Sequence, residues 1–429
     1  MDESKWRIET KAVQSGYTPE NGGPRVVPIA QSTTYKYNDV QSVADLFDLK
    51  RAGFFYTRLA NPTVDCFERK IAALEGGVAA VATSSGQNAN AFSILNIAQC
   101  GDHIVSTATL YGGTVSLFSN TLKKMGITFT FISPEASEDE IQAAVQDNTK
   151  AIFAEVLANP ALTVLDIEKF AKVAHKNGLP LIVDNTFPTP FLCRPFEWGA
   201  DIVTHSTTKY IDGHATSVGG MIVEKGGFPW DNGKFPGLVE PDESYHGLVY
   251  FKNFQPAPYS AKMRAQWIRD MGTPMMPFNA FMSMVGCETL HLRMERHSTN
   301  ALALAKHLEK HPMVKWVTYP GLESSPDYAL AQKYLNGMCS GVLCFGVKGG
   351  VKAGEIAMNS LKIAAIAVHV ADLRTCVLHP ASMTHRQLSE EELIAAGVSP
   401  DLIRVSVGLE NINDIIEDFD QALEKAKGC

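Results

Sequence analysis

A lysine that follows a buried strand is the first residue in this sequence whose position suggests chemistry. Lys209 ends the run Ser206-Thr207-Thr208-Lys209, directly after the apolar segment at residues 201–206. A lone lysine is normally a solvated surface residue. A lysine that sits beside a sheet edge is partly desolvated, so its pKa falls and its neutral amine can act as a nucleophile that forms a Schiff base. Ser206 and Thr208 alternate along an extended segment, so both hydroxyls can point to the same side.

A carboxylate is the second candidate. Asp184 ends the apolar run at residues 179–184, which is typical of a buried strand. Open α/β sheets bind ligands outside the carboxyl ends of their strands, and a carboxylate there can pair with a cationic ring nitrogen. Asp184 could equally cap the strand end through Asn185 and Thr186. The residues alone leave these two interpretations about even.

A short polar turn is the third candidate. The run Ser84-Ser85-Gly86-Gln87-Asn88 falls between a predicted strand and a predicted helix. Glycine lets a ligand approach the backbone, and the free N–H groups of a helix start suit an anion such as phosphate. By itself the run could be an ordinary helix cap by Ser84 or Ser85. A phosphate cradle, a carboxylate for a ring nitrogen and a nucleophilic amine together describe a pyridoxal phosphate site.

The elements that must position these groups alternate along the chain. Predicted strands and helices follow one another from residue 66 to about residue 225, which indicates an α/β domain with a mostly parallel sheet. We expect three parts: an irregular arm at 1–65, a large domain at 66–276, and a smaller α+β domain at 277–429. Residues 226–276 are rich in Gly, Pro and aromatic residues, so they are predicted to be an inserted loop or lid. A long helix is expected from residue 277 to residue 311.

Composition excludes several classes of protein. The chain has 429 residues, of which 45% are hydrophobic and 20% charged, as in ordinary globular proteins. Its formal net charge of −8 disfavours nucleic acid as a partner. No apolar run reaches the length of a membrane span, and no signal peptide is recognisable. The eight cysteines include no C-x-x-C pair, which predicts reduced thiols and a cytoplasmic location. No metal site is expected.

The segment at residues 201–214 resembles the lysine signature of the Cys/Met-metabolism family of pyridoxal-phosphate-dependent enzymes. The resemblance runs nearly end to end, with a departure at Ala215, and implies the aspartate-aminotransferase-like type I fold. It implies that Lys209 binds the cofactor covalently and that Asp184 keeps the pyridine nitrogen protonated. The phosphate would be held by residues around the two motifs, namely Ser85, Gly86, Gln87, Ser206 and Thr208.

The resemblance assigns further residues. Tyr111 matches the tyrosine that stacks on the cofactor ring and assists proton movement, and Asn159 would lie near the ring hydroxyl. Arg404 matches the arginine that binds the substrate carboxylate, for which its planar fork is suited. Tyr56 and Arg58 match residues that reach the cofactor phosphate of a neighbouring subunit, so the resemblance implies dimers paired into tetramers.

Three features resemble the O-acetylhomoserine sulfhydrylase branch of this family. They are residues 234–239, the segments 269–272 and 277–281, and Gly113, where methionine γ-lyases carry cysteine. The branch implies γ-replacement on O-acetylhomoserine by sulfide or a small thiol, which gives homocysteine and acetate. Residues 372–375 depart from the common pattern and leave the preferred thiol open.

The alternatives to this branch lie mostly within the same family. They are a methionine or cystathionine γ-lyase and a cystathionine γ-synthase. A non-catalytic binding or scaffold protein is the alternative from another class, and the loss of Lys209, Asp184 or Tyr111 would signal it. All three residues are present.

Overall fold

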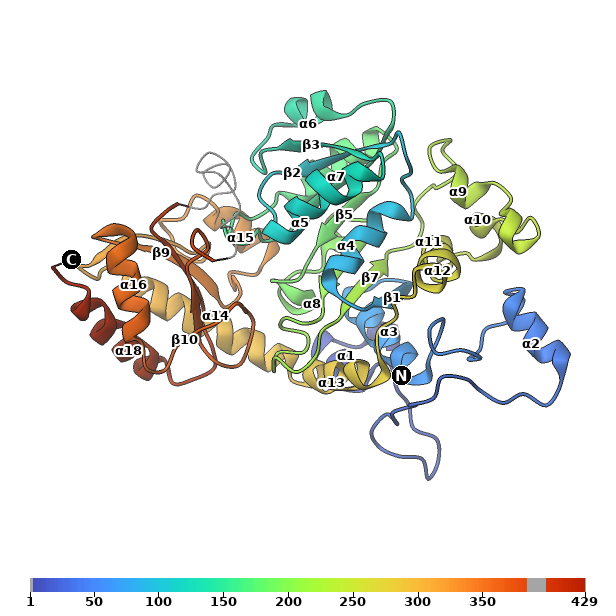
Figure 1. Ribbon diagram of the computed structural model, residues 1–429, viewed down its shortest axis with the longest axis horizontal. Helices are drawn as coiled ribbons and strands as arrows, with labels where there is room; N and C mark the ends of the chain where they lie inside the picture. The colour runs from blue at the N-terminus through green and yellow to red at the C-terminus, as the bar shows by residue number, and fades with distance from the viewer. Residues whose placement is uncertain (1–2, 384–398, 429) are drawn as a thin grey trace.

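The computed structural model of the protein describes residues 3–383 and 399–428, which form two β-sheets with helices around them (Figure 1). The larger sheet has seven strands. In spatial order they are β1 (Ala79–Thr83), β7 (Gly220–Glu224), β6 (Ile202–Ser206), β5 (Leu181–Asp184), β4 (Thr149–Glu155), β2 (His103–Thr107) and β3 (Thr128–Ile132). Strands β6, β5, β4, β2 and β3 pair in parallel, whereas β7 runs antiparallel to both of its neighbours. The expected mostly parallel sheet is confirmed.

Helices cover both faces of this sheet. Those before residue 200 are α3 (Pro62–Glu75), α4 (Gly86–Leu95), α5 (Gly112–Ser116), the π-helical turn η2 (Leu117–Leu122), α6 (Glu138–Ala144), α7 (Ile167–Lys176), α8 (Thr189–Leu192) and η3 (Pro195–Trp198). Successive residues of a strand point to opposite faces. Ile152 of β4 therefore packs in one apolar cluster with Phe67 of α3, and Phe153 packs in another with Phe92 of α4. Burial on both faces explains why the strands are apolar throughout.

The segment at residues 226–276 differs from the loop or lid expected from its composition. It forms the short elements α9 (Pro236–Val239), η4 (Glu243–Tyr245), α10 (Tyr250–Asn253), α11 (Pro258–Lys262), the π-helical η5 (Met263–Ile268) and α12 (Arg269–Met271). Trp230, Tyr250 and Tyr259 are almost completely buried and belong to the same apolar cluster as α4. The aromatic residues that made this segment look irregular are therefore part of the core beneath the sheet.

The smaller sheet has five strands. In spatial order they are β10 (Ala365–Ile366), β11 (Cys376–Leu378), β12 (Leu402–Ser406), β9 (Val342–Val347) and β8 (Val314–Thr318). The helices in this half are α13 (Pro277–Glu288), α14 (Leu290–Leu308), α15 (Tyr328–Tyr334), α16 (Gly350–Ser360) and α18 (Ile412–Lys425). The single helix expected over 277–311 is wrong in two respects, because it is interrupted at Thr289 and ends at Leu308. The exact domain boundaries stay a prediction.

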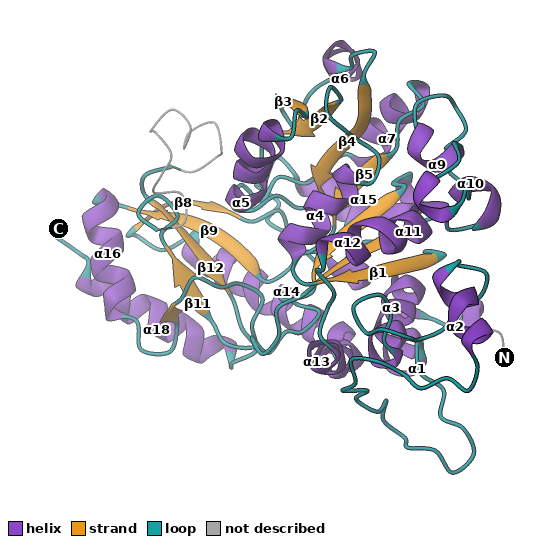
Figure 2. Cartoon of the chain, turned by 45° about the vertical axis from the view of Figure 1, so that its right-hand side comes forward, coloured by secondary structure: helices purple, strands orange, loops and turns teal. Residues whose placement is uncertain are grey.

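The first 60 residues contain η1 (Glu3–Lys5), α1 (Ile8–Gln14), α2 (Val40–Phe47) and an isolated bridge between Thr34 and Tyr56. Helix α1 packs against α3 and α13, whereas the chain around α2 extends away from both sheets (Figure 2). None of the helices that the structure describes is long and apolar enough to cross a membrane. The seven described cysteines are free, and Cys429 lies outside the described residues.

Candidate active site

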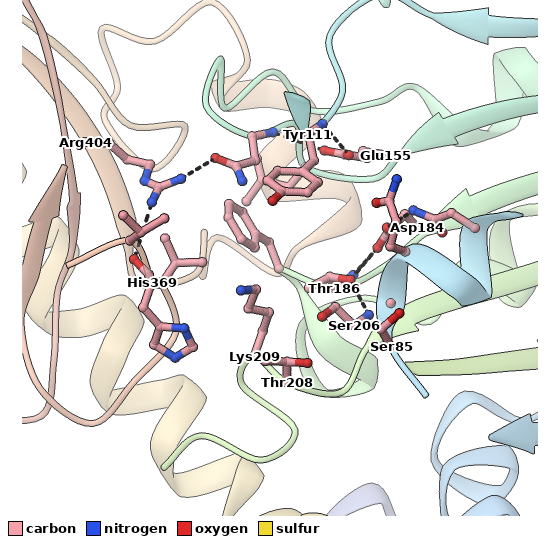
Figure 3. A pocket seen from close by; sticks show the side chains of 18 residues that line it. Ser85, Tyr111, Glu155, Asp184, Thr186, Ser206, Thr208, Lys209, His369 and Arg404 are labelled. Carbon is pink, nitrogen blue, oxygen red and sulfur yellow. Dashed lines mark hydrogen bonds between the residues drawn. The ribbon is translucent and has the colours of Figure 1, made fainter. Parts of the chain in front are cut away.

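One pocket brings together ten of the twelve residues predicted to form the site. It has a volume of about 230 Å³ and is lined by the last residues of β4, β5 and β6, which are Glu155, Asp184 and Ser206. The predicted residues in its wall are Ser85, Gly86, Gln87, Tyr111, Asn159, Asp184, Ser206, Thr208, Lys209 and Arg404. In Figure 3, Lys209 lies between Asp184 and Ser206 on one side and Arg404 on the other.

The start of α4 forms one end of the pocket. Ser85 is the N-cap residue, and its hydroxyl accepts a hydrogen bond from the backbone N–H of Asn88 at 3.2 Å. The cap interpretation and the anion-site interpretation are thus compatible, because the N–H groups of Gly86 and Gln87 have no partner within the helix. They face the pocket together with the positive end of the helix dipole, which favours an anion.

Gly86 is required by close packing as well as by any ligand. A Cβ atom at this position would lie 2.4 Å from Cβ of Ser206 and 2.6 Å from its Cα. The start of α4 and the end of β6 therefore touch backbone to backbone. This contact places the hydroxyl of Ser206 beside the free N–H groups of the helix, so both donors can serve one anion.

Asp184 is fixed by Thr186, which the sequence suggested as a partner in a strand-end cap, and by Asn90, which it did not suggest. Its Oδ1 accepts hydrogen bonds from the N–H and the hydroxyl of Thr186, and its Oδ2 accepts one from the amide of Asn90 at 3.0 Å. The hydroxyl of Thr186 also accepts from the N–H of Ser206 at 2.8 Å. Asn90 lies one turn after Gly86 on α4, and this spacing was the available signal. The carboxylate is thus held as an acceptor at the pocket wall.

Lys209 lies one turn after β6, where its amine faces the cavity (Figure 3). Burial, and to a smaller degree the positive charge of Arg404, lowers the pKa of Lys209 to about 8. Within the described part of the chain its Nζ forms no salt bridge and no hydrogen bond. A substantial fraction of this amine is therefore neutral near pH 8 and free to react.

Tyr111 forms the opposite wall, and Gly113 packs against its ring. Glu155 Oε1 accepts from the N–H of Tyr111 at 2.7 Å and Oε2 from the N–H of Asn159 at 3.1 Å. Burial and the nearby charge of Asp184 raise the pKa of Glu155 well above its usual range. The ring of Tyr111 lies over Gly113, where a Cβ atom would be 2.5 Å from Cε1. The glycine thus leaves space for the tyrosine ring.

Arg404 on β12 reaches the pocket from the smaller sheet. Only 6% of its surface is exposed. Its guanidinium donates to Oδ1 of Asn159 at 3.0 Å and to the carbonyl of His369 at 3.3 Å. His369, which was not predicted, also lines the pocket. Both hydrogen-bond acceptors are neutral, so the positive charge of Arg404 remains available to a carboxylate.

Tyr56 and Arg58 do not line this pocket. Arg58 donates to the carbonyl of Arg269, and its guanidinium carbon lies 5.2 Å from the centre of the Tyr56 ring. Tyr56 is 40% exposed. Their assignment to a neighbouring subunit's site therefore stays a prediction.

The described residues fit pyridoxal phosphate. Free helix N–H groups and two hydroxyls face one end of the cavity, a fixed carboxylate and a tyrosine ring flank it, and a reactive amine lies between them. This combination defines the class as an enzyme that uses a lysine-bound pyridoxal cofactor on amino acids.

The comparisons with known proteins agree with this class. Residues 9–424 match the model of the Cys/Met metabolism PLP-dependent enzymes, and the chain belongs to that family. It is 48% identical to a homocysteine synthase of Schizosaccharomyces pombe over 98% of both chains. It is 45% identical to an O-acetyl-L-homoserine sulfhydrylase of Leptospira meyeri, covering 98% of this chain and 97% of that protein.

A solved structure from Campylobacter jejuni, described as an O-acetylhomoserine (thiol)-lyase, shares the fold. It superposes with a TM-score of 0.95 at 37% identity and covers 98% of this chain and 100% of that one. That protein contains N'-pyridoxyl-lysine-5'-monophosphate. The type I fold and the cofactor expected from the sequence are thereby confirmed.

Proposed function

We propose that this protein is a transferase of methionine biosynthesis that replaces the acetate of O-acetyl-L-homoserine with sulfide, giving L-homocysteine. The observation that carries the proposal is the single pocket in which Lys209, Asp184 and Arg404 meet. Relatives that are 45–48% identical over nearly their full length and bear the names homocysteine synthase and O-acetyl-L-homoserine sulfhydrylase support it.

Gly113 supports replacement over elimination. The ring of Tyr111 occupies the space that any side chain at position 113 would need. A cysteine there, as in the methionine γ-lyases of the same family, would push the ring aside. The glycine therefore keeps the ring of Tyr111 at the pocket, where the leaving group and the thiol would exchange. Tyr111 is 47% exposed, so its hydroxyl is accessible there.

Each residue has a proposed role in binding. The N–H groups of Gly86 and Gln87, with the hydroxyls of Ser85, Ser206 and Thr208, would hold the cofactor phosphate. Asp184, fixed by Thr186 and Asn90, would pair with the ring nitrogen. Tyr111 would stack on the ring, and Asn159 would lie near its hydroxyl. Arg404 would bind the substrate carboxylate through two parallel N–H···O bonds.

The proton chemistry falls to Lys209 and Tyr111. When bound, pyridoxal phosphate supplies an electron-withdrawing ring that stabilises negative charge developing on the amino acid. Lys209, displaced from the cofactor by the substrate amine, would take the proton from Cα as a general base, which its lowered pKa permits at physiological pH. Tyr111 would move a proton near Cγ as acetate leaves.

We infer that Tyr56 and Arg58 complete the site of a neighbouring subunit. They lie outside their own chain's pocket, in an arm that extends away from the sheets. The carbonyl of Arg269 holds Arg58 against the insert at 226–276. A dimer, paired into a tetramer, would then be the active form.

A product assay tests the proposal. Purified protein loaded with pyridoxal phosphate is given O-acetyl-L-homoserine with and without sulfide. Homocysteine that forms only with sulfide supports γ-replacement. Keto acid and ammonia that form equally fast in both conditions would identify a γ-lyase and refute the argument from Gly113.

A further inference from the structure

A second cavity, of about 330 Å³, lies at the opposite end of α4 from the cofactor pocket. Helix α4 begins at Gly86, in the cofactor pocket, and ends at Leu95, where residues 95–100 form one wall of the second cavity. The facing wall comes from the segment at 226–276, which packs against α4 (Figure 1). No residue lines both cavities.

Lys262 is a buried cation in this wall. It is 7% exposed, and its Nζ donates to the backbone carbonyl of Asn96 at 2.7 Å and to the Oδ1 of Asn96 at 3.4 Å. Asn96 caps the carboxyl end of α4, so the lysine sits favourably at the negative end of the helix dipole. Both acceptors are uncharged, and among the described residues Lys262 forms no salt bridge. A buried charge without a counter-ion is costly.

The nearest acids are already engaged. The carboxylate of Asp242 accepts hydrogen bonds from Ser244, Tyr250 and Gln266. Asp102 faces Lys150 at 3.6 Å. The second cavity therefore keeps one positive charge in excess, and that charge belongs to Lys262.

An unused donor accompanies this charge. The indole N–H of Trp267 is buried and has no hydrogen-bond partner among the described residues. Trp267 follows Lys262 by five residues across the π-helical η5, whose i→i+5 repeat brings the two to one side of the helix. Such π-helical turns occur often at functional sites. The rest of the wall is largely apolar and includes Leu95, Ile97, Met125, Ile127, Phe235 and Leu238.

We propose that this second cavity binds a small organic carboxylate with a short apolar chain. The carboxylate pairs with Lys262 and accepts the indole N–H of Trp267, while the chain lies against the apolar wall. One excess positive charge matches one carboxylate. A phosphate dianion would bring more charge and more acceptors than these donors satisfy.

The charge state of Lys262 makes the proposal testable by pH. Burial lowers the pKa of Lys262 to about 8, with a small opposing effect from Asp242. The lysine is cationic below this pKa and neutral above it, so carboxylate binding is present at pH 7 and falls about tenfold by pH 9. A carboxylate bound at Arg404 would keep its affinity, because a guanidinium stays protonated over this range.

The experiment is a calorimetric titration of the holoenzyme with butyrate at pH 7 and pH 9, alongside butanol and inorganic phosphate. The variants are Lys262→Met, Trp267→Phe and Arg404→Lys, with the exposed Lys124→Met as the matched control. We expect one butyrate per chain at this site, an affinity at least tenfold weaker in Lys262→Met and a few-fold weaker in Trp267→Phe. Affinity should be unchanged in Lys124→Met and Arg404→Lys.

Four results would overturn the proposal. They are the absence of butyrate binding, binding that depends on Arg404 and not on Lys262, butanol binding as tightly as butyrate, and phosphate binding more tightly than butyrate. If Lys262→Met does not fold, the pH comparison on the unaltered holoenzyme and the Trp267→Phe variant decide the question by themselves.

Discussion

Lys209 and Lys262 lie near opposite ends of α4, and burial lowers the pKa of each to about 8. Their surroundings differ. Lys262 donates to the carbonyl that caps α4, whereas the amine of Lys209 has no hydrogen bond among the described residues and faces Tyr111, Asp184 and Arg404 across a cavity. A lowered pKa therefore does not define a catalytic lysine. The groups that share its cavity, and the freedom of its amine, do.

Removing Lys209 should have the largest effect. Lys209→Ala deletes both the attachment point of the cofactor and the proposed base, so kcat should fall by at least about 10³-fold. The visible absorbance of the bound cofactor should shift or disappear. Steady-state kinetics and absorbance spectra check this, with Lys124→Met as the surface-lysine control. Activity that survives in Lys209→Ala would refute the assignment.

Arg404 lines the pocket of Lys209 and has no counterpart in the cavity of Lys262. In Arg404→Lys the bidentate fork is lost, so kcat/KM for O-acetylhomoserine should fall on the order of 10²-fold, mainly through KM. Initial-rate measurements over a range of substrate concentrations separate the two constants. A fall in kcat at unchanged KM would show that Arg404 does not bind the substrate carboxylate.

The pKa of Lys209 sets how fast apoprotein takes up the cofactor. Only the neutral amine attacks the aldehyde, and the amine is mostly cationic below pH 8. Uptake should therefore accelerate about tenfold between pH 6 and pH 7 and level off above pH 8. Stopped-flow absorbance follows this directly. In Arg404→Met the removal of a nearby cation should move the curve to higher pH, and a curve that does not move would exclude that charge as a cause.

Gly113 tests the shape of the pocket rather than its charge. In Gly113→Ala the new methyl group would lie 2.5 Å from the Tyr111 ring, so the ring must move, and kcat should fall several-fold to about tenfold. Gly354→Ala is the matched control. Its Cβ meets only ordinary contacts near 3.4 Å on helix α16, where alanine is the better helix former. Equal activity of both variants would remove the argument from Gly113.

The smallest effect is expected at the other lysine. Lys262→Met removes the donor to the carbonyl of Asn96 but also removes a buried charge, and the two effects oppose each other. We expect the free energy of unfolding to fall by about 1–2 kcal/mol. Urea denaturation measures it. If the free energy of unfolding falls by more than about 4 kcal/mol, the hydrogen bond from Lys262 to Asn96 stabilises the fold by much more than the buried charge of Lys262 costs.

The residues at the strand ends could be predicted because each lies at the end of its apolar strand or within one turn of it. Asp184, Ser206 and Lys209 need only a parallel sheet to come together. The pair Arg404 and Asn159 came from family resemblance, since 245 residues separate them and no local pattern joins them. The supporting Asn90 was missed because its role depends on side-chain packing, whereas Thr186 was expected as a partner in a strand-end cap.

Neither the helices of the insert at 226–276 nor the second cavity could be predicted from the sequence, because neither leaves a local pattern in it. Helices as short as α9 and α10 have no usable periodicity, so their Pro and Gly residues indicated a loop. In the second cavity Lys262 meets Asn96 across 166 residues of chain. Neither residue carries a motif.

One measurement tests most directly whether geometry, rather than a lowered pKa, selects the reactive lysine. The holoenzyme is reduced with borohydride, which fixes the cofactor on the lysine that holds it, and the digested peptides are analysed by mass spectrometry. We predict one pyridoxyl group per chain, on Lys209. A label on Lys262, or one divided between the two lysines, would contradict the account.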